Sequence, residues 1–119
     1  ETEVAIRTFL KRKVGRQLLA VILGKLDKPN FPRADSYLYK GRRLNKWEML
    51  KIQECYISAR IIDQLRYYEK GVDKQVARNW LMMPSHHLED HVPICAIRDG
   101  RSYNHLCAVG AAKTFVLNR

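Results

Sequence analysis

A run of apolar residues between Asn45 and Gly71 constrains the fold of this 119-residue chain more than any other feature. Its apolar positions recur at spacings of three, four and seven, which is the repeat of one helix face; they are Trp47, Leu50, Ile57, Ile61, Leu65 and Tyr68. Asn45 is suited to cap the start of such a helix and Gly71 to end it. The pattern therefore predicts one long helix that forms the spine of the fold.

Shorter helices are predicted before this spine. Apolar residues at helical spacing predict a helix from Thr2 or Glu3 to about Lys13, which Gly15 ends. The block from Gln17 to Leu23 fits a buried strand or a short helix, and its Leu, Ala and Gln content favours the helix. A loop over residues 25–32 and a short helix over residues 33–40 follow.

Three further helices are predicted after the spine. Asp73 is expected to cap a helix that Pro84 ends, and Pro93 to lie in the first turn of a short helix that closes at Gly100. Ser102 is expected to cap the last helix, which runs through Leu106 to Val116. Because no segment alternates apolar and polar residues, the predicted class is all-α.

Positive charge is concentrated in the first two-fifths of the chain. Twelve of the 22 Lys and Arg residues but only four of the 12 Asp and Glu residues lie in residues 1–46, a net charge of +8 out of +10. Such an asymmetry favours a polyanionic partner, with nucleic acid preferred over a membrane surface. Charge alone does not separate DNA from RNA.

Composition and length exclude several classes of protein. A chain of this length can bury a core without metal or disulfide staples. No run of about 18 apolar residues is present, so no membrane span is expected. The odd number of cysteines, Cys55, Cys95 and Cys107, matches neither a disulfide framework nor a zinc signature. A reducing cytoplasm is the expected location.

The second half of the chain carries a spaced pattern in LNKWEMLKIQECYISARIIDQL, VARNWLMMPSHHLEDHVPICAIRDG and NHLCAVGAAKTFV. Its positions are Ala77, Trp80, Leu81, Pro84, Ser85, Leu88, Pro93, Gly100 and residues 109–115. This pattern resembles the C-terminal half of Xre/MbcA/ParS-type antitoxins. The block RQLLAVILG, followed by YLYKGRR, is similar to the helix-turn-helix of the same family.

The resemblance implies an N-terminal helix-turn-helix over residues 1–43, then a long central helix and a small helical toxin-binding unit within residues 44–119. It also implies a homodimeric, DNA-binding transcription regulator without a cofactor. Such antitoxins neutralise a RES-domain toxin that acts on NAD, and they repress the promoter of the shared operon. Open alternatives are an orphan DNA-binding regulator, an RNA-binding accessory protein, and an interaction module that has lost DNA binding.

On the helix predicted over residues 33–40 and just beyond it, seven residues are candidates for DNA contact: Arg33, Ser36, Tyr37, Tyr39, Lys40, Arg42 and Arg43. Arg can bind guanine through two hydrogen bonds, and Tyr or Ser hydroxyls can bond bases or phosphates. Most of these contacts are expected to reach phosphates, and Arg42 and Arg43 to clamp the backbone. The alternative for Tyr37 and Tyr39 is packing in the core.

The expected toxin-binding residues lie at two places in the second half: Met82 and Met83, and the terminal stretch Phe115, Val116, Leu117, Asn118 and Arg119. By the resemblance, the last helix packs on the toxin and can obstruct its active-site entrance. The alternative is that its apolar stripe closes the protein's own core. Trp80 and Pro84 are expected to be structural.

No motif predicts an enzyme or a metal site. His86, His87 and His91, with Glu89 and Asp90, are expected to form an exposed turn rather than a metal site, because Pro93 and the preceding loop argue against one regular helix. The Gly-rich phosphate loop and the common nucleophile and metalloprotease motifs are absent from the sequence.

Overall fold

The computed structural model describes residues 3–23, 44–100 and 107–119, and this part of the chain is predominantly helical. Its elements are α1 (Glu3–Lys13), α2 (Arg16–Ile22), α3 (Lys46–Asp63), α4 (Leu65–Tyr68), α5 (Val76–Leu81), the 3₁₀ turn η3 (His86–Leu88), α6 (Pro93–Arg98) and α7 (Ala108–Leu117). An isolated bridge between Ser85 and His91 is the extent of β structure in the described ranges. The predicted all-α class is confirmed.

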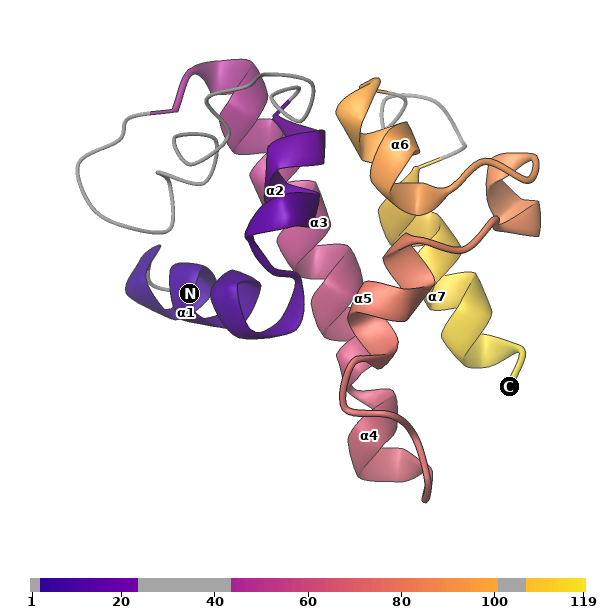
Figure 1. The fold of residues 1–119 in the computed structure, drawn as a ribbon. Helices are drawn as coiled ribbons and strands as arrows, with labels where there is room; N and C mark the ends of the chain where they lie inside the picture. The colour runs from indigo at the N-terminus through magenta and orange to yellow at the C-terminus, as the bar shows by residue number, and fades with distance from the viewer. Residues whose placement is uncertain (1–2, 24–43, 101–106) are drawn as a thin grey trace.

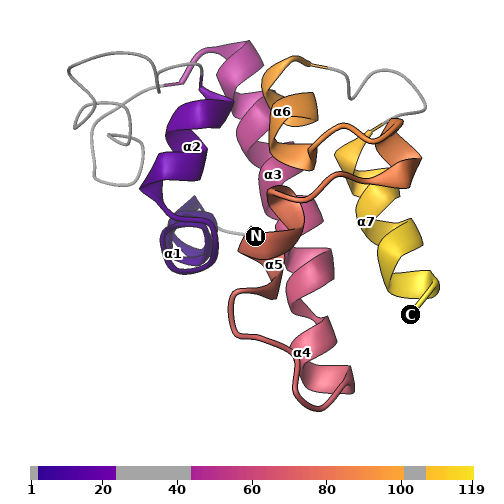
Figure 2. The same ribbon diagram turned by 45° about the vertical axis from the view of Figure 1, so that its right-hand side comes forward.

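The helices are arranged around α3. Figures 1 and 2 show α1 and α2 on one side of α3, and α6 and α7 on the other. One buried apolar cluster extends from Leu10 and Leu19 in the N-terminal helices to Ala111 and Ala112 in α7. The two halves that the sequence suggests therefore share a core.

The two N-terminal helices confirm the sequence predictions. Residues 16–22 form a helix rather than a strand, and Gly15 separates it from α1. Gly15 has φ 89° and ψ 158°, a backbone conformation that is nearly restricted to glycine. This geometry permits a tight corner in which Leu10 and Val14 remain fully buried.

Asn45 caps α3 as predicted. Its side-chain oxygen accepts a hydrogen bond from the Glu48 N–H at 2.8 Å, and the Glu48 carboxylate accepts one from the Asn45 N–H at 3.1 Å. This reciprocal arrangement is a capping box. The predicted uninterrupted run to Gly71 is wrong, because α3 ends at Asp63 and α4 at Tyr68. At the interruption the Tyr67 N–H bonds to the Gln64 carbonyl, three residues back, which tightens the turn.

The predicted apolar face of the long helix is also wrong for most of its length. Trp47 is 70% exposed, Tyr68 is 81% exposed, and Leu50 and Ile57 are also exposed, whereas Leu65 is buried. The buried face carries Ile52, Cys55, Tyr56, Ser58, Ala59 and Ile62. Apolar residues lie on two sides of this helix, and the side that includes small residues packs inward because small side chains let neighbouring helices approach closely.

The start of the last helix differs from the expectation. The helix begins at Ala108 with Cys107 as its N-cap, while Ser102 lies outside the described residues. The Cys107 Sγ accepts a hydrogen bond from the Gly110 N–H at 3.3 Å. A carboxylate oxygen of the buried Glu54, on α3, accepts a second one from the Ala108 N–H at 3.1 Å. A tertiary contact thus supplies the cap that the sequence does not reveal.

The predictions for the connecting segments are confirmed at α6 but not at the start of α5. Pro93 is the first residue of α6, and Gly100 follows that helix with φ 71°. The Asp73 carboxylate accepts a hydrogen bond from the Gln75 N–H at 2.6 Å. Gln75, not Asp73, is the N-cap of α5. α5 ends at Leu81, three residues before Pro84.

Replacing Glu54 should destabilise the fold. In Glu54→Ala the buried Ala108 N–H loses its acceptor, which costs about 1–3 kcal/mol. We expect the melting temperature to fall by roughly 4–12 °C. Glu54→Gln should cost less, because its amide oxygen can still accept the hydrogen bond. Gln53→Ala, at the exposed neighbouring position, is the control and should leave the melting curve unchanged. Equal melting temperatures for all three variants would contradict this role of Glu54.

Candidate functional site

The seven predicted DNA-binding residues lie outside the described part of the structure. Arg33, Ser36, Tyr37, Tyr39, Lys40, Arg42 and Arg43 all belong to residues 24–43. The described helices on either side of that segment are α2, which precedes it, and α3, which follows it.

The α1–α2 pair has one apolar side and one basic side. Its core residues are buried against α3 and α6. Lys11, Arg12 and Arg16 are exposed near the Gly15 corner. The helical repeat places these three side chains on a different face from the buried residues, so they are exposed while the apolar face packs in the core. The C-terminal end of α1 is basic, and its positive charges interact favourably with the negative end of the helix dipole.

Asp63 connects this corner to α4. One of its carboxylate oxygens, Oδ1, lies 3.4 Å from the Lys13 Nζ and 3.6 Å from the Arg66 Nη1. Asp63 is only 6% exposed, so the pair of cations compensates a charge that would be costly to bury alone. Lys13 and Arg66, which are far apart in the sequence, are held beside one another by this carboxylate.

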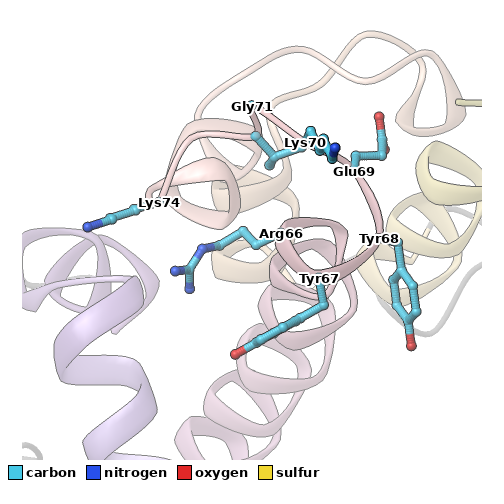
Figure 3. Close-up of a pocket in the computed structure, with 8 residues that line it drawn as sticks. Arg66, Tyr67, Tyr68, Glu69, Lys70, Gly71 and Lys74 are labelled. Atoms are coloured by element: carbon cyan, nitrogen blue, oxygen red, sulfur yellow. The ribbon is translucent and has the colours of Figure 1, made fainter.

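The start of α5 approaches the same corner. A methyl group added to Gly15 would lie 3.6 Å from the guanidinium nitrogen Nη1 of Arg78. Figure 3 shows Arg66 and Lys74 extending to the same side of the α4–α5 connection. We refer to Lys13, Arg66, Lys74 and Arg78 as the basic corner.

An open hollow of about 480 Å³ lies at the end of α4 and along the turn that follows it (Figure 3). It is lined by Arg66, Tyr67, Tyr68, Glu69, Lys70, Gly71, Val72 and Lys74. The Arg66 guanidinium lies 5.9 Å from the centre of the Tyr67 ring, a cation–π distance. Sequence reasoning missed this hollow, although the segment RYYEKGVDK, with its cations and tyrosines around one glycine, was a usable signal.

The acidic residue of the hollow is paired with the end of the described chain. Arg119 donates two hydrogen bonds to Glu69, from Nε at 2.7 Å and from Nη2 at 3.2 Å. These bonds lower the pKa of the Glu69 carboxyl and raise the pKa of Arg119. The Arg119 guanidinium also lies 5.2 Å from the centre of the Phe115 ring. The last turn of α7 is thereby attached to the end of α4.

The predicted toxin-binding residues fall into two groups with different burial. Phe115 and Val116 are half-buried and pack against the core cluster, whereas Leu117 is 83% exposed. Asn118 and Arg119 are exposed after it. Met82 and Met83 lie just after α5 and are each a little under half exposed. Trp80 is buried, as its predicted structural role requires.

The histidine cluster forms a turn, as the sequence predicts, but His87 is half-buried rather than exposed. η3 covers His86–Leu88, and Glu89 and Asp90 follow with positive φ angles of 54° and 66°. His86 is exposed and its Nδ1 lies 3.1 Å from the Asp90 carboxylate. Within the described ranges no three His, Cys, Asp or Glu side chains are grouped so as to hold a metal ion.

Comparison with protein-family models, curated proteins and solved structures finds no match to this chain. Within the described ranges, no helix combines the length and the apolar character that crossing a membrane requires.

Cys55 should be unreactive in the folded protein. Complete burial and the negative charge of Glu54 raise the pKa of its thiol to about 12, which disfavours the reactive thiolate. We expect iodoacetamide to leave Cys55 unmodified until the protein is unfolded in urea, as measured by peptide mass spectrometry. Cys95 and Cys107, which are half-buried, are the internal controls and should react first. Equal labelling of all three cysteines in native buffer would contradict this assignment.

Proposed function

We propose that the protein is a homodimeric, DNA-binding transcription regulator of antitoxin type, which neutralises a RES-domain toxin and represses its own operon. The observation that carries the DNA-binding part is the α1–α2 pair. Its apolar side is buried and its basic side is exposed, directly before the segment with the predicted recognition residues. A protein that binds the phosphate backbone needs this separation of core and charge.

In this proposal the two halves of the chain bind different partners. Residues 1–43 bind an operator in duplex DNA, and a dimer would bring two recognition helices into successive major grooves about 34 Å apart. Residues 44–119 bind the protein partner. A cytoplasmic location, without cofactor or metal, belongs to the same proposal.

The described C-terminal half offers two features in support of the partner surface. Met82 and Met83 place flexible apolar side chains next to solvent, a composition common on adaptable binding surfaces. Leu117 adds an exposed apolar side chain at the end of α7. By resemblance to the antitoxin family, inhibition would be steric, so this chain would contribute no chemistry to it.

Binding to DNA should depend strongly on salt. If six or more phosphates are engaged, the affinity should fall on the order of 10³-fold between 50 and 200 mM salt, because each contact releases a counterion. Fluorescence anisotropy with a duplex from the region upstream of the gene measures this directly. Arg42→Ala with Arg43→Ala should weaken binding to all duplexes equally, whereas Arg33→Ala should change sequence preference.

The matched control for the double variant is Lys51→Ala with Lys113→Ala, which removes the same charge from α3 and α7. This control should bind more tightly than the Arg42 and Arg43 variant. An affinity that stays flat across the salt range would refute the electrostatic basis of the proposal. A double variant that binds one sequence normally and loses another would reverse the assigned roles.

Two substitutions on α7 should separate partner binding from stability. Leu117→Ser changes an exposed side chain, so we expect an unchanged melting temperature but weaker protection of cells from the co-expressed RES-domain toxin. Phe115→Ala removes a half-buried ring and its contact with Arg119, and should lower the melting temperature by roughly 4–8 °C.

The control for the toxin experiment is Val4→Ser, which alters an exposed apolar residue on α1. It should protect cells as well as the unmodified protein does. Full protection by Leu117→Ser would remove the terminal stretch from the partner surface. An unchanged melting temperature for Phe115→Ala would show that this ring contributes little to the core.

A further inference from the structure

We propose that the hollow at the α4–α5 connection is a second phosphate-binding surface, which contacts the backbone of duplex DNA from the C-terminal half of the chain. This inference rests on the proposed DNA-binding function and extends it to the residues that line the hollow, for which the sequence predicts no partner. The recognised chemistry is the phosphodiester anion. Base edges are not part of the proposal.

Two of the three cations that line the hollow are available to a ligand, because the third, Arg66, is paired with Asp63. Arg66, Lys70 and Lys74 line it, and Lys70 and Lys74 are exposed and form no ion pair within the described ranges. Of the acids near the hollow, Glu69 accepts two hydrogen bonds from the Arg119 guanidinium and Asp63 is paired with Arg66. Asp73 is exposed and accepts a hydrogen bond from the neutral Gln75 N–H, which does not cancel a carboxylate charge. An anion that enters the hollow therefore meets Lys70 and Lys74, while the lining carboxylate, Glu69, is paired with Arg119.

The aromatic residues of the hollow suit a phosphate backbone as well. Tyr67 is 76% exposed and its ring lies near the Arg66 guanidinium, which limits the positions of both side chains. Its hydroxyl can donate a hydrogen bond to a phosphate oxygen. Most of the lining is exposed, so the shape fits an extended backbone better than an enclosed small molecule.

The hollow is continuous with the basic side of the N-terminal helices. Asp63 lies between Lys13 and Arg66, and Lys74 extends to the same side as Arg66 (Figure 3). Arg78 reaches the Gly15 corner between α1 and α2. The cations at the end of α1 and those of the hollow are therefore connected through the basic corner.

The test is the double variant Lys70→Gln with Lys74→Gln, measured by fluorescence anisotropy with a 30-base-pair duplex of mixed sequence. If both lysines contact phosphates, affinity at 0.1 M salt should fall at least about tenfold, up to about 60-fold, and the slope of log affinity against log salt should decrease in magnitude by about 1.8. The control is Lys51→Gln with Lys113→Gln, which removes equal charge outside the hollow and should retain more than half of the affinity.

The outcomes separate this inference from the proposed function. If the unmodified protein binds no duplex, both fail. If it binds but the two double variants behave alike, the function stands and the hollow is not a phosphate site. A loss seen with single-stranded RNA and not with duplex DNA would overturn the choice of ligand. Melting curves of the variants that coincide with that of the unmodified protein exclude misfolding. Tyr67→Phe, which removes only the hydroxyl, should weaken DNA binding by a smaller factor than the Lys70 and Lys74 double variant does.

Discussion

The buried carboxylate of Glu54 is the interaction on which the packing of the C-terminal half depends. The first N–H groups of any helix lack partners within that helix, and its N-terminal end attracts negative charge. Glu54, on α3, provides both the acceptor and the charge for the start of α7. This contact sets where α7 begins along α3. The far end of α7 then lies beside α4, where Arg119 bonds to Glu69.

A second buried acid on α3 organises the opposite side. Asp63 joins Lys13 of α1 to Arg66 at the start of α4. Removing either cation alone would leave the other to compensate a nearly buried charge, so the three residues act as one unit. α3 thus connects the two halves of the chain through polar contacts near its middle and its end, in addition to the shared apolar core.

Local sequence signals were sufficient for most of the described helices, but not for the break between α3 and α4, the start of α7 or the packing. The Asn45 capping box and the Gly15 break need only neighbouring residues, and both were predictable. The buried face of α3 was not, because apolar residues on two sides give the same periodicity and only the neighbouring helices select one. The cap of α7 and the basic corner join segments distant in the sequence, as does the pair Glu69–Arg119. The hollow is formed by one local segment and was not predicted, and its connection to α1 is visible only in the fold.

The distribution of acids explains why a net charge of +10 is compatible with a compact fold. Excess charge of one sign destabilises a compact state through self-repulsion. Asp63 and Glu69 lie among cations, where each offsets part of that repulsion. Lys70 and Lys74, in the α4–α5 turn, form no ion pair within the described ranges, so repulsion persists there. A bound polyanion would relieve it, and any ligand that prefers the folded state also stabilises that state. The same surface charge that limits the stability of the free protein would therefore favour the complex.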